Sequence, residues 1–289
     1  MTLDRKFKGV IVPVVTPFSD GELAEQDLRN VIAYLRRRGV TNEFYLGETG
    51  EFRYLSIEER KRVIDVAGEL KTPEVKILVG TSDTSLKDTV QLTRYAKDKG
   101  ADAAVIAPHY QVSYSALEYV RIVLEGVGLP LIIYNNPAIT NGRGFAAADL
   151  ASLAATHKDR ILGIKDSSGD QNYLEDLIRV RNKLAPWLSV LQGSEEALVE
   201  NPKAEVDGIF AGTANSDPRL FLSIFQRIQE RDFEGLEDYF ARLINYFPSY
   251  REFGVVPEIK RRLNGRGLIT SPELAPRSAI TAGKYTTKK

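Results

Sequence analysis

The sequence contains no cysteine among its 289 residues, and it has only two histidines. Disulfide bonds, thiolate nucleophiles and cysteine-ligated metal sites are therefore excluded. His109 and His157 lie far apart in the chain, and neither belongs to a His-x-x-x-His pair or to an Asp-rich ligand cluster. No Gly-x-Gly-x-x-Gly follows an apolar run and no Gly-x-Ser-x-Gly is present. We therefore predict neither a metal site nor an organic cofactor.

No charge of one sign predominates, because 39 Lys and Arg residues balance 39 Asp and Glu residues. The balance does not indicate a nucleic-acid-binding surface or an acidic tail. No apolar stretch approaches the roughly 20 residues of a membrane span. The polar first residues, MTLDRKFKG, do not resemble a signal peptide. We expect a cytoplasmic protein that has no nucleic-acid or membrane partner.

Short apolar, β-branched runs recur along the whole chain. Each run is nearly continuous rather than alternating, which is typical of strands buried on both faces. The runs span residues 10–15, 43–47, 75–80, 103–108, 131–135, 161–166, 188–193 and 207–212. Stretches of helical period lie between them, and one begins at Ser56 with a Ser-x-x-Glu capping box.

Eight strand–helix units at a step of roughly 30 residues predict an α/β fold, a (β/α)8 TIM barrel with parallel strands. A doubly wound open sheet is the alternative, and the absence of a second composition zone disfavours it. After the eighth strand the helical pattern continues for longer than one barrel unit needs. We therefore predict a barrel over 1–230 and a C-terminal helical region over 231–289.

In such barrels the active site lies at the carboxyl ends of the strands. Lys165 follows the apolar residues 161–164 directly, so its stem is expected inside the barrel mouth. Removal from water favours the neutral amine, which can attack a ketone and form an imine. An ion pair with Asp166 is the alternative. Tyr134 ends the preceding strand, where a phenol can relay protons, although a tyrosine capping the core is the commoner arrangement.

Two glycine-containing turns at strand ends are further candidate sites. The backbone N–H groups between Gly47 and Gly50 could hold a carboxylate, or the segment could be a plain connecting loop. The segments Gly193-Ser194 and Gly212-Thr213 follow the seventh and eighth predicted strands. Phosphate-binding barrels hold phosphate at these places, so a phosphate site is a further alternative.

Taken together, these strand ends resemble the dihydrodipicolinate synthase/N-acetylneuraminate lyase family. The resemblance runs from Gly9 to about Leu263 and rests on the segments VPVVTPF, GETGEFRYLSIEER, VGTSDTS, APHYQ, IIYNNP, GIKDSSGD, QGSEE and GIFAGTAN. It implies a (β/α)8 barrel with C-terminal helices and a homotetramer built as a dimer of dimers. It also implies a class I lyase that joins pyruvate to an aldehyde, or cleaves the product, through a lysine Schiff base without a cofactor.

The resemblance implies roles for individual residues. Lys165 matches the Schiff-base lysine, Tyr134 the proton-relaying tyrosine, and Thr49 part of the turn that holds the pyruvate carboxylate. Tyr110 matches a tyrosine that in some members reaches into a neighbouring subunit's site. The other matching positions, which are expected to bind substrate, are Gly47, Gly50, Ile139, Gly193, Glu195, Glu196, Ile209 and Gly212.

Two departures from the family pattern bear on the reaction and its substrate. Glu48 replaces a hydroxyl residue that normally joins the tyrosine's proton relay, so it is a further catalytic candidate unless its side chain points away. Ile139 stands where dihydrodipicolinate synthases carry an arginine that pairs with a substrate carboxylate. The apolar residue resembles the pattern of neuraminate lyases and 2-keto-3-deoxygluconate-type aldolases.

We therefore predict a small-molecule lyase or aldolase acting on a non-phosphorylated 2-keto-3-deoxy sugar acid. The loop after the fourth predicted strand, HYQVSY, lacks an arginine for a phosphate group. Three alternatives stay open: a dihydrodipicolinate synthase using aspartate semialdehyde, a sugar-acid dehydratase of the same family, and a non-catalytic barrel that binds a 2-oxo acid.

Overall fold

The computed structural model describes residues 5–108, 114–138, 140, 142 and 144–276. Eight parallel strands close into a barrel in the order β1-β10-β9-β8-β7-β6-β5-β4, so the barrel prediction is confirmed and the open sheet is wrong. The strands are β1 (Gly9–Pro13), β4 (Asn42–Tyr45), β5 (Lys76–Gly80), β6 (Ala103–Ile106), β7 (Leu131–Asn135), β8 (Ile161–Asp166), β9 (Ser189–Gln192) and β10 (Gly208–Phe210). A short antiparallel pair after β1, β2 (Phe18–Ser19) and β3 (Glu22–Leu23), was not predicted.

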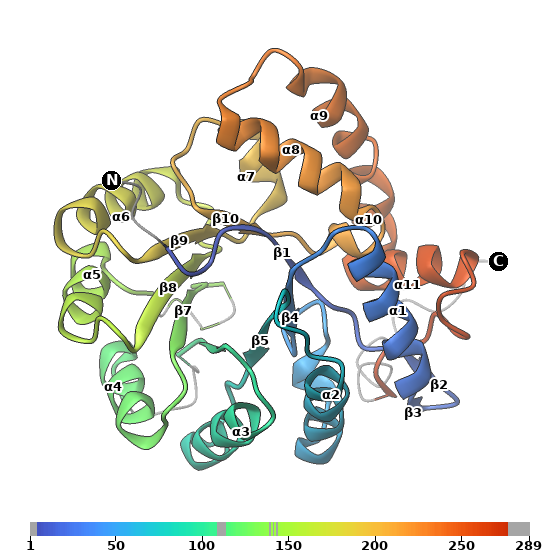
Figure 1. The fold of residues 1–289 in the computed structure, drawn as a ribbon, viewed down its shortest axis with the longest axis horizontal. Coiled ribbons are helices and arrows are strands. Elements are labelled where there is room, and N and C mark those ends of the chain that lie inside the picture. The colour runs from blue at the N-terminus through green and yellow to red at the C-terminus, as the bar shows by residue number, and fades with distance from the viewer. Residues whose placement is uncertain (1–4, 109–113, 139, 141, 143, 277–289) are drawn as a thin grey trace.

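Helices ring the barrel and cover its outer face (Figure 1). They are α1 (Glu25–Arg37), α2 (Ile57–Glu69), α3 (Leu86–Asp98), α4 (Ala116–Gly126), α5 (Ala147–Thr156), α6 (Gln171–Leu184), α7 (Glu195–Glu200) and α8 (Pro218–Glu230), with 3-10 turns at Phe52–Tyr54 and Thr213–Asn215. The predicted capping box begins α2: the Ser56 hydroxyl accepts from the Glu59 N–H at 3.2 Å, and the Glu59 carboxylate accepts from the Ser56 N–H at 2.6 Å. This exchange satisfies two N–H groups that the helix itself leaves unpaired.

The predicted C-terminal helical extension follows α8 in the chain. It consists of α9 (Leu236–Ile244), α10 (Phe247–Phe253) and α11 (Val255–Gly265), and Figure 1 shows α11 beside α1. The proposed division at residue 230 coincides with the end of α8 and stays a prediction. In the part of the chain that the structure describes, none of the helices is long and apolar enough to cross a bilayer.

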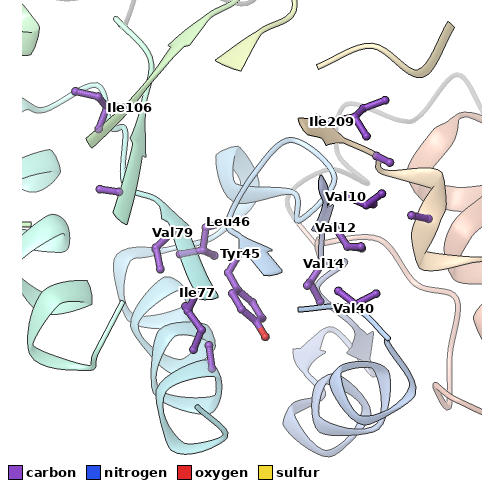
Figure 2. Packing of buried hydrophobic residues seen from close by; sticks show 14 of the residues in the cluster. Val10, Val12, Val14, Val40, Tyr45, Leu46, Ile77, Val79, Ile106 and Ile209 are labelled. Atoms are coloured by element: carbon purple, nitrogen blue, oxygen red, sulfur yellow. The ribbon is translucent and has the colours of Figure 1, made fainter. Parts of the chain in front are cut away.

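Strand residues alternate between two hydrophobic cores. Val10, Val12, Ile77 and Val79 point outward and pack with the helices in one cluster, part of which Figure 2 shows around β1, β4 and β5. Their neighbours along the strands fill the barrel interior in a second cluster, which includes Ile11, Phe44, Leu78, Val105, Ile132, Leu191 and Phe210. Burial on both faces explains why the strands read as continuous apolar runs.

Strand β8 contains one extra residue relative to β7. This bulge determines which side chains at the carboxyl end of β8 point into the barrel. Leu131 pairs with Ile161, but Ile132 pairs with Gly163, so Leu162 has no partner of its own on β7. Beyond the bulge Tyr134 pairs with Lys165. A register shift of one residue moves a side chain to the opposite face of a sheet. The bulge therefore directs Lys165 into the barrel rather than toward the helices.

Candidate active site

A cavity of about 370 Å³ opens at the carboxyl ends of the strands. It is lined by eight of the residues singled out in the sequence: Glu48, Thr49, Tyr134, Lys165, Gly193, Glu195, Glu196 and Gly212. A larger depression of about 450 Å³ lies at the opposite end, between α6, α8 and the loop before β10. It contains none of these residues, and its buried cation Arg181 is already paired with Asp207 at 2.8 Å. We therefore take the first cavity as the candidate site.

Lys165 lies at the bottom of the candidate site and is 6% exposed. Its Nζ is 3.8 Å from the ring centroid of Tyr134, 4.6 Å from that of Phe210 and 5.3 Å from that of Phe44. No ion pair of Lys165 is found among the described residues. The amine is therefore held among aromatic faces rather than against a carboxylate.

Asp166, the alternative partner of Lys165, forms hydrogen bonds with other residues. Its carboxylate accepts from Asn135 Nδ2 at 2.7 Å and from the Ser168 hydroxyl at 3.0 Å. Burial raises the pKa of Asp166, and these hydrogen bonds oppose the rise. Asp166 thus ties the ends of β7 and β8 together, and the geometry does not support the ion-pair interpretation of Lys165.

Tyr134 lines the cavity next to Lys165, and its phenol oxygen accepts a hydrogen bond from Asn136 Nδ2 at 2.8 Å. The side chain is 9% exposed, so the hydroxyl does not extend into bulk solvent as a core-capping tyrosine would. Asn136 was missed in the sequence. Its position two residues after Tyr134 could have indicated it, because alternate residues of an extended chain face the same side.

The turn from Gly47 to Gly50 approaches the end of β10 closely. A Cβ atom on Gly212 would lie 3.0 Å from Thr49 Oγ1, so the absence of a side chain at Gly212 lets the turn reach this position. The Thr16 hydroxyl, in the loop after β1, donates to the Gly50 carbonyl at 2.8 Å and fixes the turn. Thr49 is therefore presented to the cavity by tightly packed backbone.

Glu48 turns its carboxylate toward Arg53. The Arg53 Nε donates to both carboxylate oxygens at 2.9 and 3.1 Å, and the Glu48 side chain is 39% exposed. The outward alternative considered for Glu48 matches this orientation. The residue still contributes to the cavity wall, and a catalytic role for its carboxylate stays a prediction.

A buried ion pair holds the far side of the same turn. Lys260 of α11 is fully buried and pairs with Glu51, which is 5% exposed and has a left-handed backbone (φ 58°). The Glu51 carboxylate also accepts from the Ala275 N–H at 2.8 Å, and the Lys260 amine donates to the Glu273 carbonyl at 2.7 Å. Burial lowers the pKa of Lys260, while the charge of Glu51 raises it. Because the partners are 209 positions apart in the sequence, no sequence pattern indicated the pair.

Two glutamates form the wall of the cavity at the start of α7. The carboxylate of Glu195 accepts from the Thr213 N–H at 2.8 Å and from the Thr213 hydroxyl. Burial raises the pKa of Glu195 to about 7, although its bonds to Thr213 favour the charged form. The Glu196 carboxylate pairs with Arg251 of α10 at 2.8 Å. Together with Phe247 and Tyr250, Arg251 makes the C-terminal extension part of the cavity wall, a contribution that sequence reasoning did not predict.

The raised pKa of Glu195 predicts a change of stability with pH. A carboxyl with a folded-state pKa near 7 and an ordinary value of 4.5 stabilises the fold fully below pH 4.5 and loses that contribution as the pH rises through 7. Glutamine does not titrate. The stability of Glu195→Gln relative to the native chain is therefore expected to rise by roughly 3 kcal/mol between pH 4.5 and pH 8.

Urea unfolding of both proteins at a series of pH values measures this difference. Glu196→Gln is the matched control, because Glu196 is the exposed neighbour on the same helical turn. A stability difference for Glu195→Gln that stays constant across the pH range would show that the carboxyl titrates in its ordinary range.

The remaining predicted residues are placed as follows. Gly47 and Gly50 lie in the turn behind Thr49, and the Ile209 side chain packs in the outer core, so Ile209 presents only backbone to the barrel mouth. Tyr110 and Ile139 lie outside the described residues. Their predicted roles in the neighbouring subunit's site and in substrate selection stay predictions.

The fold and the cavity place the chain among (β/α)8-barrel proteins whose candidate active site lies at the carboxyl ends of the strands. More narrowly, the chain belongs to the dihydrodipicolinate synthetase family, whose sequence profile matches residues 6–289. It is therefore a member of a family of lyases.

The relatives of this chain include proteins named as lyases, aldolases and synthases. A DapA-like lyase of Thermococcus onnurineus is 31% identical over 93% of this chain and 92% of its own. The Escherichia coli protein YagE, named a putative 2-dehydro-3-deoxy-D-gluconate aldolase, is 31% identical over 85% of this chain and 82% of its own. A crystal structure of YagE in complex with pyruvate matches with a TM-score of 0.85 and 28% identity, covering 95% of this chain and 96% of that one. The 4-hydroxy-tetrahydrodipicolinate synthase of Methanothermobacter thermautotrophicus is 31% identical over 79% of this chain and 82% of its own.

Proposed function

We propose that the protein is a class I aldolase that forms or cleaves a carbon–carbon bond between pyruvate and an aldehyde. The observation that carries the proposal is the juxtaposition of Lys165 and Tyr134 in one cavity. Lys165 is a buried amine that has no carboxylate partner among the described residues, and Tyr134 is a buried phenol beside it. Such an amine can act as the nucleophile toward a ketone, and the phenol can transfer the protons that the addition requires.

In the cleavage direction, the neutral amine of Lys165 adds to the C2 carbonyl of the 2-oxo acid. Tyr134 protonates the departing hydroxyl, water leaves, and a protonated imine remains. Tyr134 then removes the proton of the C4 hydroxyl while the electrons of the C3–C4 bond move into the imine. The aldehyde departs and leaves an enamine, which is protonated at C3 and hydrolysed to pyruvate and the free lysine. Thr49 and the adjacent N–H groups hold the substrate carboxylate and fix the position of C2.

For the aldehyde part we propose a non-phosphorylated sugar fragment. The wall beyond Lys165 is formed in part by Glu195 and Glu196, whose carboxyl oxygens can accept hydrogen bonds from the hydroxyl groups of a sugar. A phosphate or a second carboxylate would instead favour an unpaired cation. The nearby cation, Arg251, is already paired with Glu196. The name of YagE agrees with a 2-keto-3-deoxy sugar acid, and the synthase relative keeps aspartate semialdehyde as the second candidate. We further propose a homotetramer, in keeping with the role assigned to Tyr110.

The test is to incubate the protein with pyruvate and borohydride and to locate the reduced adduct by mass spectrometry. We expect a pyruvyl adduct on Lys165, and its absence would refute the mechanism. Aldol synthesis from pyruvate should then proceed with glyceraldehyde and much more slowly with aspartate semialdehyde or N-acetylmannosamine. Water release without an aldehyde from a sugar acid would instead identify a dehydratase. An adduct without turnover of any substrate would identify a binding protein.

A further inference from the structure

Only one of the two polar atoms of the Asn136 amide has a hydrogen-bond partner among the described residues. Its Nδ2 donates to the Tyr134 phenol oxygen at 2.8 Å, while its Oδ1 is buried and has no hydrogen-bond partner among the described residues. An unpaired buried acceptor destabilises a fold, because it gives up its hydrogen bonds to water and gains none in the protein. A leucine of nearly the same shape would avoid this cost, so packing alone does not account for an amide at this position.

We propose that Asn136 is a positioning residue that prepares the Tyr134 phenol for proton transfer, an inference that rests on the proposed Schiff-base chemistry. An amide N–H can only donate, so the proton of the phenol itself is not taken up by Asn136. That proton stays available to the cavity, where the Lys165 Nζ lies 3.8 Å from the ring centroid. When Tyr134 gives up its proton, the charge that develops on its oxygen faces a donor already in place.

The surroundings of Asn136 keep the donor in position. The side chain is 9% exposed, and the Thr140 hydroxyl donates to the Asn136 carbonyl at 3.0 Å, which fixes the backbone beyond the end of β7. Glu48 does not fill this role, because its carboxylate is held by Arg53 at the rim. Asn136 thus supplies the polar contact to the phenol that the departure at Glu48 leaves missing from the turn.

The experiment compares the native chain with Asn136→Leu and Asn136→Asp. The rate of imine formation is followed by quenching pyruvate reactions with borohydride at short times, and KM and kcat are measured for aldol cleavage. Loss of a hydrogen bond to a developing charge is expected to slow imine formation about 10- to 100-fold in both variants. The pyruvate concentration for half-saturation should change less than about twofold. Asn136→Leu should unfold at the same temperature as the native chain or higher, because the unpaired acceptor is gone.

Asn136→Asp adds a pH signature and tests the orientation of the amide. A neutral carboxyl can donate to the phenol but a carboxylate cannot, so the rate of the variant relative to that of the native chain at the same pH should rise as the pH is lowered. If the phenol instead donated to Oδ1, the aspartate would keep the native rate at neutral pH, and the proposal would be overturned. The aspartate variant also carries the test if Asn136→Leu fails to fold.

Asn42→Leu is the matched control, since Asn42 is a buried asparagine at the opposite end of the barrel, bonded to the Lys8 and Val10 carbonyls. It should lose stability and keep the native rate of imine formation. A native rate in Asn136→Leu, or a loss of rate that only parallels a loss of stability and a raised KM, would contradict the proposal. If the native chain forms no adduct at all, the proposed function fails rather than the role of Asn136.

Discussion

Replacing Lys165 by methionine is expected to eliminate the borohydride-trapped pyruvate adduct and to lower turnover by at least about 1,000-fold. Methionine keeps much of the length of the lysine side chain but has no amine to add to a carbonyl. The neighbouring Tyr134 and Thr49 remain in place, so any residual binding of the 2-oxo acid reports the carboxylate contacts alone. Kinetic assays of aldol cleavage and mass spectrometry of the reduced adduct measure both effects.

The same substitution should leave the fold at least as stable as before. Lys165 lies among the rings of Phe44, Tyr134 and Phe210 without an ion-pair partner among the described residues, and a thioether makes favourable contacts with aromatic rings. Lys183→Met on the exposed face of α6 is the control for loss of a lysine and should keep full activity. An adduct that persists in Lys165→Met, for example on Lys260, which is also buried, would refute the assignment of the nucleophile.

Replacing Lys260 by methionine is expected to destabilise the protein by about 3–5 kcal/mol, because it leaves the buried carboxylate of Glu51 without its cation. The loss should also reach the active site. Glu51 follows Gly50 directly and holds a left-handed backbone conformation, so a relaxed Glu51 allows Thr49 and its neighbouring N–H groups to shift. We therefore expect a raised KM for pyruvate together with the lower stability. Urea unfolding and pyruvate saturation of imine formation measure the two effects.

A double variant separates the charge from the packing. Glu51→Gln combined with Lys260→Met removes both charges and keeps an oxygen for the Ala275 N–H, so it should recover part of the lost stability. Arg53→Met is the matched control, because it breaks the exposed pair with Glu48 and should cost less than about 1 kcal/mol. If Lys260→Met and Arg53→Met lost the same free energy of unfolding, burial of the Glu51–Lys260 pair would not increase its contribution to stability.

Features governed by local pattern could be predicted from the sequence. The eight strands were recognised because burial on both faces leaves a continuous apolar run, and the start of α2 because Ser56 and Glu59 interact within one turn. The position of Lys165 and Tyr134 at strand ends also followed from the sequence, whereas the inward direction of Lys165 depends on the bulge at Leu162, which no sequence pattern indicated.

Features that depend on distant partners could not be predicted. The ion pair of Lys260 with Glu51 and the contact of Arg251 with Glu196 join segments whose proximity only the folded chain determines. The direction of the Glu48 side chain was also not predicted, although its partner Arg53 is only five positions away, because an irregular turn with a left-handed Glu51 separates them. In each case the sequence shows a charged residue but does not show which residue it pairs with.

The bulge at Leu162 determines which residues of β8 point into the barrel. In a regular strand Ile161 and Ile164 would face opposite sides, yet both pack outward here. Lys165 faces inward only because Leu162 is an extra residue in β8 that has no partner on β7. A chain that lost a single residue at this point would keep every side chain of the candidate site and still turn its lysine away from it. A lysine in the corresponding strand of a related barrel is therefore equivalent to Lys165 only if its side chain lies on the same face of the strand.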